Sequence, residues 1–175
     1  MKKNITILAL NKQFKKKIAK NLSKKLDMFY VDTNELLKYD LMNIDKVIKL
    51  AGLDYYNKVE EKTIKSLSSY ENVIITMDND SFFNKNNYKY LKESSLFIYI
   101  KLSYKLFVQI LTKEKPKTSK YELMLDKKIY NERDKILTEV CDIKVNISES
   151  TKNIEEKIIE EIKKYYKDIL WKVVI

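Results

Sequence analysis

Five short apolar runs alternate along this chain with segments that have a helical hydrophobic period. The runs are Asn4–Leu10, Met28–Val31, Asn72–Met77, Leu96–Leu102 and Asp142–Ile147. They are largely continuous, whereas a strand with one face in water would alternate apolar and polar residues. Continuous apolar strands separated by helices are typical of a parallel sheet that is covered on both faces. The chain is therefore predicted to have an α/β fold.

Helical patterns lie between these runs, at Lys15–Leu26, Thr33–Tyr39, Ile44–Leu50, Asp54–Leu67, Asn84–Leu91, Ser103–Thr112 and Tyr121–Leu137. A final helix follows the fifth run, and we expect Ser150 or Thr151 to cap it. The chain has no linker, repeat or low-complexity block. Its 175 residues suit one compact domain, so we expect a single domain over residues 1–175.

The charge of the chain is +10, yet Arg133 is the one arginine among 35 basic residues. The lysines are spread among 25 acidic residues, and lysine does not make the bidentate contacts by which arginine reads bases. This pattern favours a solvated surface over specific nucleic-acid binding. No apolar stretch approaches the roughly 18 residues of a membrane span, and Cys141 is a single cysteine. We expect a cytoplasmic protein with no membrane partner.

The stretch ILALNKQFKKKIAKNL has the frame of a phosphate-binding loop, with an apolar run, a loop, a lysine and a helical pattern in that order. In the motif G-x-x-x-x-G-K-[ST], the glycine positions hold Ala9 and Phe14, the lysine is Lys15 and the hydroxyl position is Lys16. Glycine lets backbone N–H groups approach the phosphates, and the hydroxyl binds Mg²⁺. The loop therefore lacks the usual residues for this chemistry.

Two interpretations of Lys15, Lys16 and Lys17 stay open. Cations at the start of a helix oppose its dipole by about 0.3–1 kcal/mol each, and a bound phosphate would relieve that repulsion. The interpretation that we favour is a solvent-facing lysine run on a helix that tolerates it. The chain has no histidine, so there is no histidine base or histidine metal site, and we expect no metal site.

The order of motifs resembles shikimate kinase from about residue 3 to residue 166. After the loop frame come MFYVDTNELL, GLDYYNKVEEKTIKSL, NVIITMDND, KEKPK and NERDKILTEVCDIKV. The resemblance implies a P-loop kinase of the nucleoside-monophosphate-kinase type, with a five-stranded parallel sheet in a three-layer α/β/α fold. It also implies phosphorylation of shikimate from Mg-ATP in aromatic amino-acid biosynthesis. The resemblance depends on spacing and order more than on identities.

By position, the resemblance assigns a catalytic role to three residues. Lys15 is the lysine of the loop, Asp32 matches the first carboxylate of F-x-D-x-D, which acts near the magnesium, and Asn34 matches the second, which contacts the shikimate hydroxyls. The R-P of the family's lid becomes Lys115-Pro116. The candidate nucleotide-binding residues are Lys12, Phe14, Lys15, Lys16, Lys17 and Lys115.

The substrate motifs are carried over in the same way. G-E-x-x-F-R-x-x-E falls on Gly52 to Glu60, and its substrate-binding arginine becomes Asn57. The G-G-G stretch whose backbone lines the pocket falls on Met77 to Asn79. R-x-P-x-Y becomes R-D-K-I-L, in which Arg133 matches the arginine that grips the shikimate carboxylate. The candidate substrate-binding residues are Asn34, Asn57, Asp78, Asn79 and Arg133.

Simpler roles compete with these assignments. Asn34 cannot act as a carboxylate base, and Asn57 lacks the charge of an arginine. Asp32 is more simply the N-cap of the helix after Thr33. Arg133 could instead form an ion pair with an acidic neighbour in sequence, Glu132 or Asp134.

We therefore favour a degenerate shikimate kinase homologue that has lost the ATP/Mg-binding loop and most shikimate-binding residues, and that has a non-catalytic, binding or regulatory role. We expect it to need no cofactor, and its expected partner is a shikimate-pathway protein or a small anion. One alternative is a functioning shikimate kinase that uses Mg-ATP with an atypical loop, in which lysine charge replaces part of the magnesium charge. A second alternative is a polyanion-binding or structural module.

Overall fold

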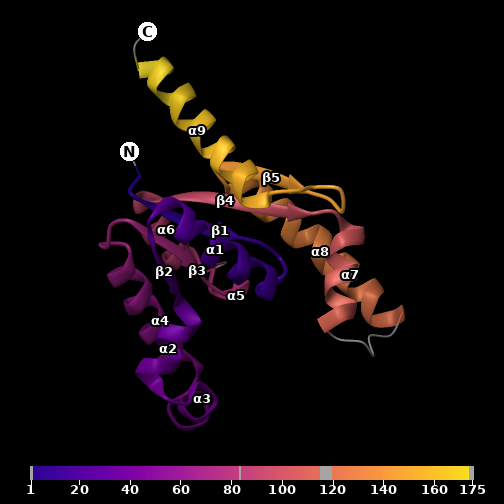
Figure 1. Ribbon diagram of the computed structural model, residues 1–175. Coiled ribbons are helices and arrows are strands. Elements are labelled where there is room, and N and C mark those ends of the chain that lie inside the picture. The colour runs from indigo at the N-terminus through magenta and orange to yellow at the C-terminus, as the bar shows by residue number, and fades with distance from the viewer. Residues whose placement is uncertain (1, 83, 115–119, 174–175) are drawn as a thin grey trace. The chain divides into compact units, whose positions relative to one another are not determined.

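The computed structural model describes residues 2–82, 84–114 and 120–173 (Figure 1). Within these residues the strands are β1 (Asn4–Leu8), β2 (Phe29–Asp32), β3 (Val73–Thr76), β4 (Ser95–Leu102) and β5 (Ile143–Ile147). They form one sheet in the order β2-β3-β1-β4-β5. The pairs β1–β3, β2–β3 and β4–β5 are parallel. The predicted α/β fold with a five-stranded parallel sheet is confirmed.

The helices are α1 (Lys12–Leu26), α2 (Thr33–Leu41), α3 (Ile44–Ala51), α4 (Leu53–Leu67), α5 (Asn79–Phe82), α6 (Lys85–Ser94), α7 (Tyr104–Glu114), α8 (Lys120–Val140) and α9 (Ile154–Val173). The single turn α5 was not predicted, because four residues are too few to show a helical period. The predicted cap of the last helix is wrong. The helix begins at Ile154, and the Thr151 hydroxyl instead accepts a hydrogen bond from the backbone N–H of Ser148 at 3.0 Å.

The chain forms two compact units. Unit 1 consists of Met1–Leu8 and Ala19–Phe97, and unit 2 of Ala9–Ile18 and Ile98–Ile175. Helix α1 begins in unit 2 and continues in unit 1, and β4 begins in unit 1 and continues in unit 2. The single domain expected from the chain length stays a prediction.

The core of unit 1 is built on β1 and β3, in which every residue is buried. Ile5 of β1 lies opposite Ile74 of β3 in the parallel register. Burial on both faces explains why these two runs are mainly apolar. The rings of Phe82, Tyr88 and Phe97 pack edge to face, with centroids 5.6–5.8 Å apart, and this cluster packs α5 and α6 on the first residues of β4.

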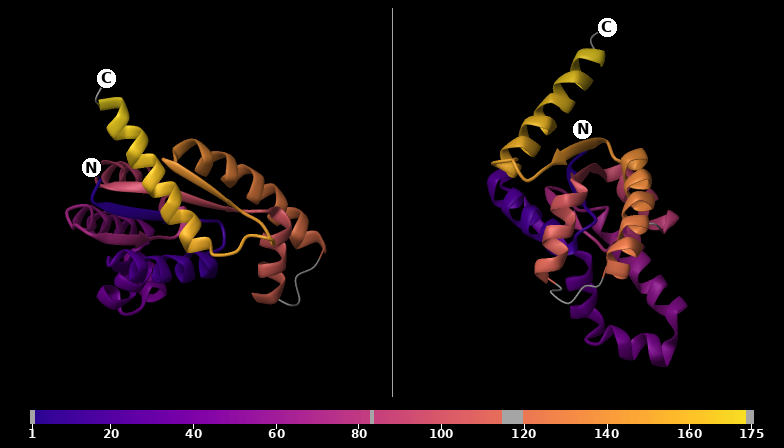
Figure 2. Two further views of the ribbon diagram at one scale, coloured as in Figure 1. Left: turned by 45° about the horizontal axis from the view of Figure 1, so that its top comes forward. Right: turned by 90° about the vertical axis from the view of Figure 1, so that its right-hand side faces the viewer.

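Helices α2, α3 and α4 contact one another in unit 1. Both figures of the whole chain show them extending from the strands of this unit, with α3 farthest from β1 to β3 (Figures 1 and 2). Asn43 caps α3 by accepting a hydrogen bond from the backbone N–H of Lys46 at 2.8 Å. The helix ends at Ala51 and is followed by its C-cap Gly52, whose φ of +87° lies in the region that favours glycine. This turn therefore accounts for the one glycine of the chain.

Unit 2 is built on β4 and β5, which pair from Ile98↔Ile143 to Leu102↔Ile147. Ile143, Val145 and Ile147 of β5 are buried and alternate with exposed residues, as expected of a strand at the edge of a sheet. Helix α9 packs on β5 and buries Ile158. Over the ranges that the structure describes, no helix combines the length and the apolar character needed to cross a membrane.

Candidate functional site

The loop frame covers the end of β1, residues 9–11 and the first turns of α1, and the boundaries of these elements differ from the predicted ones. Strand β1 ends at Leu8 instead of Leu10, and α1 begins at Lys12 instead of Lys15. The early start of the helix has a local cause, because Asn11 occupies the position before the first helical residue. Its side-chain oxygen accepts a hydrogen bond from the backbone N–H of Phe14 at 2.7 Å, which is the geometry of an N-cap.

Two backbone amides of the loop frame are thereby engaged within the chain. The N–H of Phe14 donates to the Asn11 side chain, and the N–H of Lys15 donates to the Asn11 carbonyl at 3.0 Å. In a phosphate-binding loop, amides of this stretch point toward the phosphates. The Asn11 amide nitrogen also donates to Glu114, the last residue of α7, at 3.1 Å, so that the cap is held from two sides.

The lysines of the loop frame differ in exposure. Lys12 and Lys17 are exposed and Lys16 is half-buried, but only 2% of Lys15 is accessible to solvent. The interpretation of the cluster as a wholly solvent-facing run is therefore wrong for Lys15. Both Lys15 and Lys16 interact with other groups of the chain. The candidate Lys115 lies outside the described residues.

Asp32 of unit 1 is held by the chain through both carboxylate oxygens. One oxygen accepts the backbone N–H of Glu35 at 3.0 Å and so caps α2, which confirms the predicted N-cap. The other accepts the Thr76 hydroxyl at 2.8 Å, and that hydroxyl also lies 2.9 Å from the Tyr30 hydroxyl. The residue is buried at the end of β2, where it joins α2 to the neighbouring strand β3.

The structure brings two of the position-matched substrate residues together. The Asn34 amide on α2 donates a hydrogen bond to the carboxylate of Asp78, which lies just after β3. Asn34 is buried and Asp78 is half-buried. Asn57 is half-buried on α4, and Asn79 is the first residue of α5. Asn34 and Asp78 are thus hydrogen-bonded to each other within the chain.

Glu60, which sequence reasoning missed, is the centre of the polar contacts in unit 1. Glu60 is 4% exposed, and its carboxylate accepts hydrogen bonds from the Ser81 hydroxyl at 2.6 Å, the Tyr56 hydroxyl at 3.1 Å and the Asn87 amide at 3.3 Å. Burial, and then the Glu60 charge, raise the pKa of Tyr56 well above its usual value, which keeps its hydroxyl a donor. The signal in the sequence was the final glutamate of the motif that begins at Gly52.

These contacts fix the segment that follows β3. Glu60 lies on α4, Ser81 on α5 and Asn87 on α6, so one carboxylate joins three helices. Asn87 also donates to the Ser81 carbonyl at 3.0 Å. The segment that begins at Asp78 stands where the resemblance has glycines, and here it is a helical turn anchored from two sides.

Arg133 lies in unit 2, in the interior of α8. The family motif has proline two residues after the arginine, whereas this chain has Lys135 there and the helix runs unbroken to Val140. Proline would remove a backbone N–H and interrupt the helix at that point. The Arg133 side chain is half-buried. The backbone around it is therefore regular helix.

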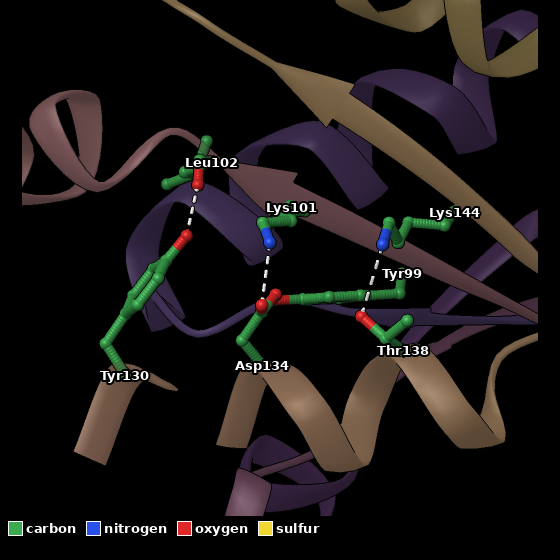
Figure 3. A network of polar contacts seen from close by, with 7 residues as sticks. All are labelled: Tyr99, Lys101, Leu102, Tyr130, Asp134, Thr138 and Lys144. Carbon is green, nitrogen blue, oxygen red and sulfur yellow. Dashed lines mark hydrogen bonds and ion pairs between the residues drawn. The ribbon is translucent and has the colours of Figure 1, made fainter. Parts of the chain in front are cut away.

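The residue after Arg133 binds α8 to β4. Figure 3 shows Tyr99 and Lys101 of β4 pointing toward Asp134, with hydroxyl and ammonium donating to its two oxygens at 2.8 and 2.7 Å. One turn earlier on α8, the Tyr130 hydroxyl donates to the Leu102 carbonyl at 2.6 Å. Both oxygens of Asp134 thus have donors on the strand, and this network fixes the position of α8 on β4.

No cluster of three or more acidic, cysteine or histidine side chains that could hold a metal ion occurs within residues 2–82, 84–114 and 120–173. The candidate residues divide between the two units. Lys12, Phe14, Lys15, Lys16, Lys17 and Arg133 belong to unit 2, and Asp32, Asn34, Asn57, Asp78 and Asn79 belong to unit 1.

The comparisons with known proteins agree with one another. A family model described as shikimate kinase matches residues 14–164, a range that begins at Phe14, the second glycine position of the loop motif. The shikimate kinase of Caldicellulosiruptor bescii is 32% identical over 99 residues, 56% of this chain and 58% of that enzyme. That of a Sulfurihydrogenibium species is 23% identical over 165 residues, 93% of this chain and 99% of that enzyme.

Solved structures show the same fold. The shikimate kinase of Aquifex aeolicus has a TM-score of 0.70 at 23% identity, over 95% of this chain and 98% of that chain. A shikimate kinase of Acinetobacter baumannii in complex with shikimate has a TM-score of 0.71 at 14% identity, over 94% and 93%. The fold is thus the three-layer α/β/α fold of the P-loop kinase type.

Proposed function

The chain belongs to the shikimate kinase family, and from this premise we propose that it is a non-catalytic member with a binding or regulatory role. The observation that carries the proposal is the cap at the start of α1. Asn11 engages the backbone N–H groups of Phe14 and Lys15, so the two amides are already used inside the chain. A phosphate at this loop would have to displace the cap.

The side chains of the loop support the same conclusion. Lys16 stands at the position of the magnesium-binding hydroxyl and puts a cation where a dication would lie. Phe14 stands at a glycine position, where backbone must approach the nucleotide closely. Binding of Mg-ATP at these positions requires glycine and a side-chain hydroxyl. Phe14 and Lys16 therefore do not fit Mg-ATP. We derive no phosphoryl-transfer step through this loop.

The position-matched substrate residues of unit 1 support the same proposal. Asp32 uses both oxygens for Glu35 and Thr76, and Asn34 is paired with Asp78. Asp78 also adds a negative charge where an anionic substrate would lie, which opposes its binding. The role that remains is binding of a shikimate-pathway protein or of a small anion near the buried Lys15.

A working shikimate kinase is the second candidate, and specific observations favour it. The chain keeps Lys15, Asp32 and Arg133 at matched positions, and the curated relatives are named shikimate kinases. In this candidate the ammonium groups near Lys15 supply charge in place of magnesium. Its distinguishing property is ATP binding that persists in EDTA.

The experiment is calorimetry with ATP, with and without Mg²⁺, followed by shikimate and by inorganic phosphate, together with a coupled turnover assay. The Aquifex aeolicus shikimate kinase serves as the positive control under identical conditions. We expect no heat of binding and no rise in the free energy of unfolding at about 1 mM ATP. A ligand present at 100 times its Kd would raise that free energy by about 2.7 kcal/mol. Turnover of shikimate with a kcat of about 1 s⁻¹ or more would refute the proposal. ATP binding in EDTA that is lost in Lys15→Ala would favour the second candidate.

A further inference from the structure

Asp78 binds a buried amide of unit 1 from inside the chain. Asn34 is 8% exposed on the first turn of α2, and its amide donates to the carboxylate of Asp78, which lies between β3 and α5. Asp78 itself is half-buried, so the pair stands at the boundary between the interior of unit 1 and solvent. A ligand that is to accept this hydrogen bond from Asn34 has to displace the Asp78 carboxylate.

Both members of the pair are fixed by other contacts of unit 1. Asn34 follows Asp32, whose carboxylate joins the start of α2 to Thr76 of β3. The Asp78 carbonyl accepts a hydrogen bond from the backbone N–H of Phe82 at 3.1 Å. Phe82 is 2% exposed and belongs to the aromatic cluster that packs α5 and α6 on β4. The backbone of Asp78 is therefore held in place opposite Asn34.

The group that Asp78 adds to this position accepts hydrogen bonds and donates none when it is ionised. An anion also brings only acceptors, so it has to take the Asn34 N–H away from Asp78. A hydroxyl group can instead donate to Asp78 and share the carboxylate with Asn34, because a carboxylate accepts several hydrogen bonds. Glu60 shows the same preference within the chain, since its three hydrogen bonds come from two hydroxyls and one amide.

Asp78 also sets the charge that a ligand meets in unit 1. The position-matched residues of this unit carry two negative charges and no positive one, and they are Asp32, Asn34, Asn57, Asp78 and Asn79. The charge of Asp78 acts on its surroundings, because burial, then Glu60 and then Asp78 raise the pKa of Tyr56. A negative charge on a ligand is repelled at such a position, whereas an uncharged hydroxyl is not.

We propose that Asp78 is a specificity-determining residue of unit 1, where it accepts hydrogen bonds from an uncharged, hydroxylated ligand and rejects an anionic one. This inference rests on the proposed binding role and names the class of ligand that unit 1 takes. The small anion considered near Lys15 is a separate ligand, because Lys15 belongs to unit 2.

Shikimate and methyl shikimate are suitable probes, because they carry the same hydroxyl groups and differ in the negative charge of the carboxylate. Calorimetric titration of the full chain without ATP, up to about 20 mM ligand, gives Kd for both compounds. We expect methyl shikimate to bind the unmodified chain about tenfold more tightly, which is the repulsion of unit charges roughly 10 Å apart at an effective dielectric constant of about 20. Asp78→Asn removes the charge, so shikimate should bind about tenfold more tightly and the ratio should fall to about one.

Glu61→Gln is the matched control. It makes the same change of charge on α4, at a carboxylate that accepts hydrogen bonds from Tyr90 and Asn86 instead. It should leave the tenfold ratio between the two compounds unchanged. Asp78→Ala removes the same charge as Asp78→Asn and serves as a second variant, and circular dichroism shows which of them is folded.

The proposal is wrong if neither compound binds the unmodified chain or the Asp78 variants. It is also wrong if shikimate binds the unmodified chain as tightly as methyl shikimate does, or binds a folded Asp78 variant no more tightly than the unmodified chain. None of these titrations contains ATP, so their failure leaves the proposed loss of ATP binding and turnover untouched. Turnover of ATP would in turn refute the proposed function without changing the measured ratio.

Discussion

The carboxylate of Glu60 is predicted to be a principal source of stability in unit 1. Glu60 is 4% exposed, and its carboxylate accepts three hydrogen bonds from neutral donors, at 2.6 Å from Ser81, 3.1 Å from Tyr56 and 3.3 Å from Asn87. A hydrogen bond to a charged group contributes about 1.5–3 kcal/mol, but burial of the charge itself costs several kcal/mol. The net contribution is therefore smaller than the sum of the three bonds.

The perturbation is Glu60→Ala, which removes the acceptor and leaves its donors behind. The Ser81 hydroxyl is buried and loses its partner, which costs about 1–3 kcal/mol. Asn87 is also buried but keeps its bond to the Ser81 carbonyl, and Tyr56 is only half-buried. Together with the cavity left by the side chain, these losses predict a decrease of about 2–4 kcal/mol in the free energy of unfolding.

The adjacent Glu61 offers a matched control on the same helix. It accepts hydrogen bonds from Tyr90 and Asn86, both at 3.2 Å, but it is only half-buried. Glu61→Ala should cost less than about 1 kcal/mol in urea unfolding followed by circular dichroism. Glu60→Gln keeps one acceptor oxygen and should fall between the two. Equal losses in Glu60→Ala and Glu61→Ala, or a loss below about 0.5 kcal/mol in Glu60→Ala, would refute this reasoning.

Three further predictions concern other polar contacts. Asp32→Ala removes both the cap of α2 and the acceptor for Thr76, and should lower the free energy of urea unfolding by about 2–3 kcal/mol. Asp32→Asn keeps a capping oxygen and should lower it by less than about 1 kcal/mol. An Asp32→Asn variant as unstable as Asp32→Ala would contradict the capping role. Asn11→Ala should lower the free energy of unfolding by about 1–2 kcal/mol, because the cap of α1 and the bond to Glu114 are both lost. Asn11→Ser should recover part of this loss. No change in Asn11→Ala would mean that the cap contributes nothing. Burial, and then the charge of Asp134, raise the pKa of Tyr130 to about 12, above the unfolded value of 10.0. The stability that Tyr130 contributes is therefore complete below pH 10 and is lost as the pH rises to 12. Tyr130→Phe should flatten this decline in the free energy of unfolding, and the same slope against pH in both proteins would contradict the prediction.

Local features of the fold were predictable from the sequence. The continuous apolar runs of β1 and β3 reflect burial on both faces, which a window of a few residues can show. The N-cap at Asp32 was predictable because donor and acceptor are three residues apart, at Glu35 and Asp32. The cap of α9 was predicted wrongly at Ser150 or Thr151. Several polar residues in a row there offer alternative local bonds, and Thr151 bonds Ser148 instead.

The candidate site was predictable only in part, because its contacts join distant parts of the chain. Asn11 and Glu114 are 103 residues apart, and Glu60 bonds partners 21 and 27 residues away. Lys15 lies in a lysine-rich stretch, which indicates a solvated face of the helix. Tertiary packing nevertheless leaves Lys15 only 2% exposed. The motif positions predicted which residues belong to the site, whereas the hydrogen-bond partners of these residues are apparent only in the structure.

The pairing of polar groups bears on whether a ligand is needed at the matched positions. A site that had kept its ligand-binding groups without a ligand would leave buried polar atoms without partners. Over the part of the chain that the structure describes, the buried side-chain oxygens without a partner are those of Thr6, Thr33, Asn87, Ser94 and Ser95. None of them is a position-matched residue. Asp32, Asn34 and Asp78 instead have partners within the chain. A ligand there must compete with these partners, which lowers its affinity and favours the non-catalytic proposal over a working kinase.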